Sequence, residues 1–286
     1  MLTLIAYLAL QSSLDLTPFA VVKEPALGEI SGIVKGTHQR YWVHNDSGDS
    51  ARIFAIDKEG KVIKPSAEDS KGIRIEPGKN VDWEDIAFYN GKLYISDLGN
   101  NGNARKDLGV YMVAEPDPMK TDVMRGAKFF PVTYPNQTAF PPPIRHFDCE
   151  AIFFYGGKLH ALTKHRMPNG QIPESGTNLY RLETQFTDRS NVLRKLDSKE
   201  DMKGWVTAAD ARGRYLAVLT QFPTASIWIF DMQAVGDKLL SKPIRWVELK
   251  NARQCEAICF DGNDTLIVAN EQRDIFRIPL EKVPKL

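Results

Sequence analysis

One short pattern recurs along the chain and constrains its fold more than any other feature. An aliphatic residue is followed by an aromatic residue, any residue and a large apolar residue. The five copies span residues 53–56, 110–113, 179–182, 227–230 and 275–278, so they begin 57, 69, 48 and 48 residues apart. Repeats of this length are typical of folds in which one small unit of secondary structure is repeated around an axis or along a stack.

Two further strand-like runs precede each copy. The first runs are residues 30–34, 83–88, 149–154, 206–211 and 255–260. The second runs are residues 41–43, 93–95, 159–161, 216–218 and 266–268. Turn sequences such as Asn90-Gly91 and Gly156-Gly157 join first to second runs, and they supply the positive φ that short hairpins need.

A less regular fourth strand follows the third run in most repeats. The candidates are residues 128–133, 191–196 and 243–249, and in the first repeat either 61–63 or 72–75. Four antiparallel strands repeated radially form the blades of a β-propeller. Long amphipathic helix patterns are absent from the sequence, so the chain is predicted to be all-β.

The ends of the chain indicate how the ring closes. The last repeat lacks an obvious fourth strand, whereas residues 17–23 form an orphan strand before the first repeat. We therefore expect this N-terminal strand to complete the last blade, which removes an exposed sheet edge. The prediction is one propeller domain over residues 14–286 with five blades. The alternative is six blades, with an irregular one in the proline-rich stretch 115–145.

The first 13 residues form a short apolar segment. They resemble the core of a secretory signal peptide, although a positive n-region and a good cleavage site are missing. The segment indicates either export, to the periplasm or the medium, or a buried first strand. It is shorter than the roughly 20 residues that span a bilayer, and no other segment could cross one.

Composition excludes several classes of protein. Lysine plus arginine number 37 and aspartate plus glutamate 36, with no basic stripe, so nucleic acid is not an expected partner. Three cysteines at unsuitable spacings argue against a disulfide scaffold or a zinc knuckle. Cys149 and Cys255 occupy equivalent positions in their repeats and are expected to fill space between blades. We expect a monomer.

Aligning the five repeats places polar residues together at one mouth of the central channel. The first position of the inner strand reads Ser31, Glu84, Glu150, Thr207 and Glu256. Two residues earlier the chain has Glu29, Asp82, Asp148, Trp205 and Gln254. The position after the second strand reads Asn45, Asp97, Thr163, Thr220 and Asn270. The intervening positions are mainly apolar, so period-two alternation separates blade packing from channel lining.

The convergence of Glu84, Glu150 and Glu256 allows two interpretations. Like charges brought together need a cation, a shared proton or solvent. Carboxylates mixed with asparagine oxygens suit a hard cation such as calcium better than zinc. Alternatively, these groups accept hydrogen bonds from backbone amides and cap the ends of inner strands.

Basic residues lie near the same mouth. His146 and His165 are candidates for proton transfer, and Arg145, Lys164 and Arg273 are candidates for binding an anionic group. A solvated loop is the alternative interpretation for His146, His165 and the neighbouring Arg145, Lys164 and Arg166. His44 and His160 lie inside second strands and are expected to be packed residues.

Several segments carry a resemblance to known proteins. They are Glu29-Ile-Ser-Gly-Ile, Trp83-Glu-Asp-Ile-Ala-Phe, Tyr94-Ile-Ser-Asp-Leu-Gly-Asn-Asn, Cys149-Glu-Ala-Ile and Cys255-Glu-Ala-Ile. From about Glu29 onward the chain resembles secreted bacterial phytase-like propellers, also described as esterase-like. It is more distantly similar to the gluconolactonases and diisopropyl fluorophosphatases, six-bladed enzymes with a calcium ion in the channel. That likeness implies calcium ligands at Glu29 or Glu84, and at Asn45, Asp97 and Asn270.

The leading hypothesis is an exported hydrolase with a channel-bound divalent cation, expected to be calcium. The ion would act as a Lewis acid on a small, anionic phosphoester, lactone or related ester. Glu84, Glu150 or Glu256 would be the general base, with His146 or His165 carrying a proton. A non-catalytic binding propeller and a five-bladed glycoside hydrolase are the alternatives, because propellers host all of these roles.

Overall fold

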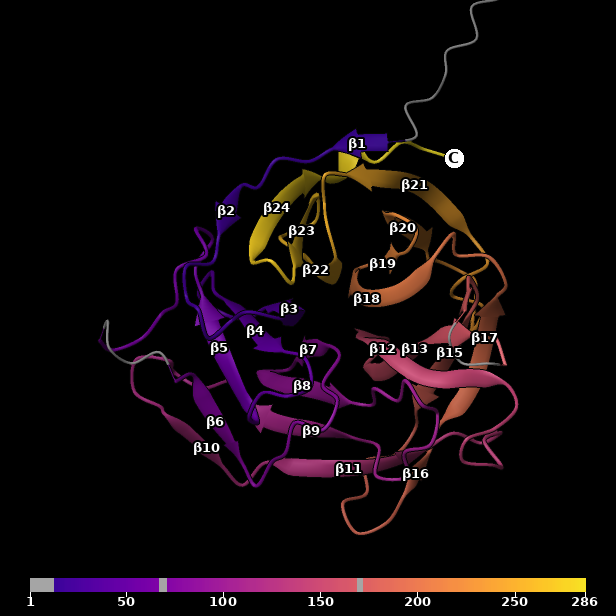
Figure 1. The fold of residues 1–286 in the computed structure, drawn as a ribbon, viewed down its shortest axis with the longest axis horizontal. Helices are drawn as coiled ribbons and strands as arrows, with labels where there is room; N and C mark the ends of the chain where they lie inside the picture. Colours follow the sequence, from indigo (N-terminus) through magenta and orange to yellow (C-terminus); the bar gives the residue numbers. More distant parts are fainter. Residues whose placement is uncertain (1–12, 67–70, 169–171) are drawn as a thin grey trace, which may run out of the picture.

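The computed structural model describes residues 13–66, 71–168 and 172–286, and it shows a five-bladed β-propeller (Figure 1). Five small, mainly antiparallel sheets stand around a central axis, which confirms the fold predicted from the repeats. The signal-like segment lies outside the described residues, apart from Ser13. Within the described ranges, the one helix is the 3-10 turn η1 (Leu280–Lys282), and no helix has the length and apolar character of a membrane span.

The strands of each blade follow chain order from the axis outward. The first blade contains β3 (Ile30–Lys35), β4 (Tyr41–Asn45), β5 (Arg52–Ile56) and β6 (Ile73–Glu76). The second contains β7 (Ile86–Tyr89), β8 (Lys92–Asp97), β9 (Gly109–Ala114) and β11 (Lys128–Thr133). The third contains β12 (Arg145–Tyr155), β13 (Lys158–Arg166), β15 (Thr177–Leu182) and β17 (Arg194–Lys199), with β14 (Pro173–Glu174) beside β13.

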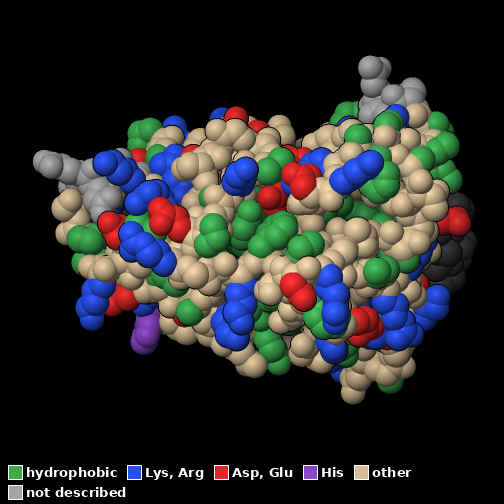
Figure 2. Space-filling model, turned by 90° about the horizontal axis from the view of Figure 1, so that it is seen from below, with side chains coloured by type: hydrophobic (Ala, Val, Ile, Leu, Met, Phe, Trp, Pro, Cys, Tyr) green, Lys and Arg blue, Asp and Glu red, His purple; other side chains and the backbone are tan. Residues whose placement is uncertain are grey.

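The last two blades follow the same plan. The fourth contains β18 (Trp205–Arg212), β19 (Tyr215–Gln221), β20 (Ala225–Asp231) and β21 (Pro243–Lys250). The fifth contains β22 (Cys255–Phe260), β23 (Thr265–Asn270) and β24 (Asp274–Pro279), and β2 (Ala20–Val21) completes it. Five hydrophobic clusters fill the structure, each between two neighbouring blades. Acidic and basic side chains are intermixed on the face shown in Figure 2.

The N-terminal segment closes the ring, as the sequence predicts. Strand β2 pairs antiparallel with β24, where Ala20 lies opposite Ile275. The preceding strand β1 (Ser13–Asp15) pairs in parallel with β21 of the fourth blade. The two short strands therefore tie the last two blades together along the outer rim (Figure 1).

Parallel outer strands are a feature that the predicted four-stranded blades lack. Strand β10 (Val123–Arg125) adds to β6, and β16 (Asn191–Val192) adds to β11. As with β1, the segment that leads to the outer strand of one blade covers the outer edge of the preceding blade. Covering an edge removes unpaired backbone groups that could pair with another chain.

Two alternatives are settled by these strands. Residues 115–145 contain β10 and β11, so the predicted sixth blade is wrong. In the first blade the outer strand is Ile73–Glu76, close to the predicted 72–75, while Val62 forms an isolated bridge to Ile56.

A β-bulge occurs at the start of the inner strand in every blade. In four blades the pairing register shifts so that one residue is extra, namely Ser31, Glu150, Thr207 or Glu256. In the second blade the Glu84 amide donates to the Ser96 carbonyl, and the Ser96 amide donates to Asp85, which gives the same arrangement. The residue before each bulge is fully buried between blades. A bulge re-aims a side chain, so these five point to the channel.

A buried carboxylate joins the inner strands of three blades. Asp85 Oδ1 accepts a hydrogen bond from the Ile86 amide at 2.8 Å. Its Oδ2 accepts from the Ile152 amide at 2.8 Å and from the Ala209 amide at 3.5 Å, in the third and fourth blades. Burial raises the pKa of Asp85 well above its usual value, and the amide donors oppose that rise.

We expect Asp85→Ala to lower the free energy of unfolding by about 1–3 kcal/mol, because it leaves buried amides without an acceptor. Urea unfolding of the purified variant measures this. Asp188→Ala, at an exposed position of the outer rim, is the matched control and is expected to change little. Equal unfolding midpoints for the two variants would contradict the role assigned to Asp85.

Candidate functional site

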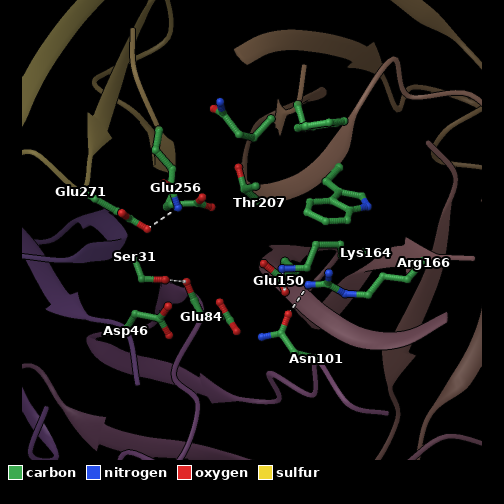
Figure 3. Close-up of a pocket in the computed structure, with 14 residues that line it drawn as sticks. Ser31, Asp46, Glu84, Asn101, Glu150, Lys164, Arg166, Thr207, Glu256 and Glu271 are labelled. Carbon is green, nitrogen blue, oxygen red and sulfur yellow. Dashed lines mark hydrogen bonds and ion pairs between the residues drawn. The ribbon is translucent and has the colours of Figure 1, made fainter. Parts of the chain in front are cut away.

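A pocket of about 430 Å³ lies at one mouth of the channel (Figure 3). All five bulge residues line it: Ser31, Glu84, Glu150, Thr207 and Glu256. The remaining lining residues come mainly from strand ends and adjoining loops, and they are Asp46, Asn101, Lys164, Arg166, Trp205, Gln221, Phe222, Gln254 and Glu271. The five residues that the repeats align at the start of the inner strand therefore line one pocket.

Carboxylates outnumber cations in this pocket. Asp46, Glu84, Glu150, Glu256 and Glu271 line it, against Lys164 and Arg166. Burial raises the pKa of Glu84 and of Glu150 well above the usual range. The proximity of Glu150 raises that of Glu84 further, whereas Lys164 opposes the rise in both. The pocket is thus an unfavourable place for all these acids to be charged at once.

Lys164 is the internal counterion of one group of acids. One oxygen each of Glu84, Asp148 and Glu150 lies within 4.8 Å of the others. The Lys164 ammonium forms an ion pair with Glu150 and lies 3.8 Å from Asp148 Oδ2. Burial lowers the pKa of Lys164, but Glu150 and Asp148 outweigh burial, and the net pKa is raised. This group already contains a cation.

A second group of acids has no such counterion. One oxygen each of Asp46, Asp82 and Glu84 lies within 4.8 Å of the others. Within the described part of the chain, no lysine or arginine nitrogen lies within 4.0 Å of these three carboxylates. Burial raises the pKa of all three, that of Asp82 to about 6.

The backbone leaves room for these carboxylates at Gly99. A Cβ on Gly99 would lie 2.3 Å from Glu84 Oε1 and 2.6 Å from Asp82 Oδ2, both closer than real Cβ contacts. The glycine therefore allows the two acids to approach the loop after β8. Lys164 lowers the pKa of all three acids and Arg105 that of Asp82, but burial outweighs them. Three converging carboxylates without an ion pair in the described ranges have the chemistry of a site for a hard divalent cation.

Of the residues predicted as metal ligands, Glu84 lines the pocket, whereas Glu29, Asn45, Asp97 and Asn270 lie outside it. The side chains of Asn45 and Asn270 bond to backbone groups near their own strands, Asn45 donating to Ala26 O at 2.6 Å. Asp97 accepts from a backbone amide and from Arg105 Nη2 at 3.0 Å. These three do not line the pocket, and their contacts are those of the capping alternative. Glu29 is exposed outside the pocket.

The two histidines predicted to carry protons face away from the pocket. Their rings stack on each other at 3.6 Å, on the opposite face of the β12–β13 hairpin from Lys164. His146 Nε2 lies 2.9 Å from Glu174 Oε2, and His165 Nε2 lies 3.0 Å from Thr163 Oγ1. Burial and then His146 lower the pKa of His165 to about 2. Alternation along β13 explains the placement, because Thr163 and His165 share one face and Lys164 and Arg166 the other.

Of the basic residues predicted to bind an anion, one lies in the pocket. Lys164 lines it, Arg273 lines a separate shallow depression with Glu29 and Glu271, and Arg145 lies beside Arg166 on the same hairpin. The catalytic, anion-binding and metal-binding residues predicted from the sequence do not include Arg166, Asp46, Asp82, Asp148 or Trp205. The aligned position two residues before the inner strand contains three of these, Asp82, Asp148 and Trp205, and could have identified them.

Two aromatic side chains form one wall. The Trp205 indole donates from Nε1 to the His165 carbonyl at 2.6 Å, and its ring lies 5.9 Å from that of Phe222. Phe222 is 52% exposed and has a φ of 70°. That conformation is costly for a bulky residue and tends to be retained at ligand-binding positions.

Comparison with known proteins shows the fold. No protein-family model matches the chain, and no curated protein sequence matches it. Similar solved structures include the PQQ-bound aldose sugar dehydrogenase from Streptomyces coelicolor, with a TM-score of 0.54, 9% identity, and coverage of 92% of this chain and 97% of that one. A luciferin-regenerating enzyme gives a TM-score of 0.47, 12% identity, and coverage of 90% and 80%. At this identity the likeness to the sugar dehydrogenase structure extends to architecture alone.

Glu256 provides a pH test of the pocket. Burial raises its pKa from 4.5 to about 7, and Lys164 opposes this while Glu271 adds to it. A raised pKa means that the folded state holds the proton more tightly, so this stabilisation is present at low pH and is lost as pH rises through 7. Glutamine at position 256 has no charged form, so the variant avoids the free-energy cost of a buried ionised carboxylate at high pH.

We expect the stability of Glu256→Gln relative to wild type to increase from pH 5 to pH 8. Urea unfolding of metal-free protein at each pH measures the difference. Buried histidines titrate in both proteins. Their effect therefore cancels in the difference between the two free energies of unfolding. A difference that stays constant across this range would show that Glu256 titrates normally.

Proposed function

We propose that the protein is a hydrolase whose active site is the acidic pocket at the channel mouth. The observation that carries the proposal is the convergence of oxygens from Asp46, Asp82 and Glu84. Among the described residues, no lysine or arginine nitrogen lies within 4.0 Å of them, and Lys164 is paired with the neighbouring Glu150. A divalent cation held by these three residues would relieve their repulsion and stabilise their charged forms. Calcium is the proposed ion, because ligands that are all oxygens suit a hard cation better than zinc.

The pocket residues divide the chemistry of ester hydrolysis among them. A cation held by Asp46, Asp82 and Glu84 would supply Lewis acidity to the substrate oxygen. Glu256 is suited to general acid–base catalysis, because its pKa of about 7 lies near neutral pH. Lys164, held by Glu150, can stabilise negative charge that develops on the substrate. The proposed substrates are a phosphoester, a lactone or another ester.

Two alternatives make different demands on the pocket. In a glycoside hydrolase the paired carboxyl groups stand about 5–5.5 Å apart in retaining enzymes and about 6.5–9.5 Å apart in inverting ones. One oxygen each of Glu84 and Glu150 lies within 4.8 Å of the other, so this pair is nearer the retaining spacing than the inverting one. A non-catalytic binding propeller would use the same pocket without turnover. The proposal that the protein is exported rests on the apolar N-terminal segment alone.

Cation binding is tested by isothermal titration of the chelated protein with calcium, magnesium, manganese and zinc. We expect calcium to bind, and at 100 times its dissociation constant to raise the free energy of unfolding by about 2.7 kcal/mol. Asp82→Asn should weaken binding at least tenfold. Glu29→Gln, an exposed acid outside the pocket, is the control and should bind as wild type does. If none of the four ions binds, the cation site is overturned.

Catalysis is tested on a panel of p-nitrophenyl phosphates, carboxylic esters and lactones. On any substrate that wild type hydrolyses, Glu256→Gln should lower kcat about 10²–10⁴-fold, because the acid–base group is lost. The folded state of the variant is checked by circular dichroism, and Glu29→Gln again serves as the control. Full activity in Glu256→Gln would remove this residue from the mechanism. Cation binding without turnover on the whole panel would favour the binding propeller.

A further inference from the structure

Two arginines stand directly opposite each other at the open end of the β12–β13 hairpin. Arg145 of β12 and Arg166 of β13 are paired residues in the antiparallel ladder. Directly paired residues project to the same face, and like charges in that position destabilise a sheet. Arg166 lines the pocket. The chain therefore maintains an unfavourable charge pair beside its proposed active site.

The two guanidinium groups have buried donors without acceptors. Arg166 Nη2 donates to the side chain of Asn101, and Arg145 Nη1 donates to the Gly102 carbonyl at 2.5 Å. Among the residues that the structure describes, the buried Nε atoms of both arginines have no hydrogen-bond partner. A buried donor left unpaired costs the desolvation free energy of that group.

Protein carboxylates compensate this charge poorly. Asp148 Oδ2 lies 3.8 Å from Arg166 Nε and 3.8 Å from Lys164 Nζ, and it accepts no hydrogen bond. In the described ranges, no carboxylate oxygen lies within 4.0 Å of Arg145. Asp148 is thus shared, at 3.8 Å, between Lys164 and Arg166, and Arg145 has no carboxylate at that distance in the described ranges.

Arg166 is held in place. The Trp205 ring lies 4.4 Å from the Arg166 guanidinium carbon, and the indole is fixed by its hydrogen bond to the His165 carbonyl. Stacking of this kind fixes the plane of a guanidinium and leaves its edge available for a planar or tetrahedral oxyanion. A donor set that is oriented before binding loses less entropy on binding.

We propose that Arg145 and Arg166 bind an oxyanion substituent of the substrate, so that the substrate is an ester that also carries a carboxylate or phosphate group. That the anion is part of a substrate rests on the proposed function. Arg166 and Asp46 lie on opposite sides of the pocket, with Lys164 and Glu150 nearer Arg166 (Figure 3). The anionic group would bind at the arginine pair, while the scissile bond lies toward the acids.

Placing the anionic group at the arginines, away from the acids, agrees with the distribution of charge in the pocket. An anion that entered among Glu84, Glu150 and Glu256 would be repelled by them. Arg166 lines the pocket at the side away from Asp46 (Figure 3), and Arg145 is its paired residue on the hairpin, beside the lining residues. An oxyanion at the accessible edge of these guanidinium groups would screen the two positive charges from each other.

The test is titration of inorganic phosphate, and separately of acetate, into chelated wild-type protein at constant ionic strength. We expect saturable binding of at least one anion, and the stronger of the two identifies the substituent. Arg145→Gln and Arg166→Gln should each weaken binding at least tenfold. Arg74→Gln, on the outer strand β6, is the control and should leave binding unchanged. Arg166→Lys keeps the charge without the guanidinium donors, and should bind more weakly than wild type even if Arg166→Gln fails to fold.

The outcomes separate this inference from the proposed function. Calcium binding without binding of either anion overturns the arginine pair and leaves the cation site intact. A second result is possible: wild type binds an anion, both arginine variants lose that binding, and no divalent cation binds. This result supports the arginine pair and overturns the cation site. Anion binding that is equal in wild type, Arg145→Gln and Arg166→Gln shows non-specific association and overturns the inference.

Discussion

The β-bulge at the start of each inner strand is the constraint on which the site depends. A regular strand would alternate its side chains between the two faces of a blade. The extra residue breaks this alternation once per blade, always one position after a fully buried residue such as Trp83 or Cys149. Its side chain is thereby directed out of the packed interface and toward the channel mouth. Five polar groups from five blades reach one pocket in this way.

The acids near the axis belong to two physically different kinds. Asp85 and Asp210 accept hydrogen bonds from backbone amides of neighbouring blades, so their charge is compensated by donors that also join the inner strands. Glu84, Glu150 and Glu256 lie at the bulges and have no comparable set of amide donors. The first kind stabilises the ring, and the second kind remains available to a cation, a proton or a substrate.

The sequence pattern was sufficient to predict the five-bladed ring, but it predicted only part of the candidate site. Repeat spacing predicted five blades and closure by the N-terminal strand, because both follow from hydrophobic pattern. It could not predict β1, β10 and β16, which are two or three residues long and pair in parallel at outer edges. For Asn45, Asp97 and Asn270 it left capping and metal binding open, since a polar residue after a strand suits both. Only their hydrogen-bond partners distinguish the two roles.

The β12–β13 hairpin is a second case in which the sequence could not predict which side chains face the pocket. His146 and Arg145 are neighbours in sequence, and so are His165 and Arg166, yet the arginines project to the pocket side and the histidines to the other. Which pair faces the pocket depends on two register irregularities between Arg145 and Ala151, and a sequence gives no clear signal of them. Chemical type favoured the histidines for catalysis, whereas strand geometry favours the arginines as the groups that contact a ligand.

Lys164 explains why the acids of one pocket can have two roles. A lysine carries a single fixed charge, so it compensates Glu150 and part of Asp148 but cannot also neutralise Glu84, which belongs to both acid groups. Glu84 is left between an internal cation on one side and two uncompensated aspartates on the other. Because Lys164 is nine-tenths buried and tied to Glu150, it cannot swing across the pocket without separating a buried ion pair. The remaining negative charge at Asp46 and Asp82 therefore has to be met by solvent, protons or an ion from outside the chain.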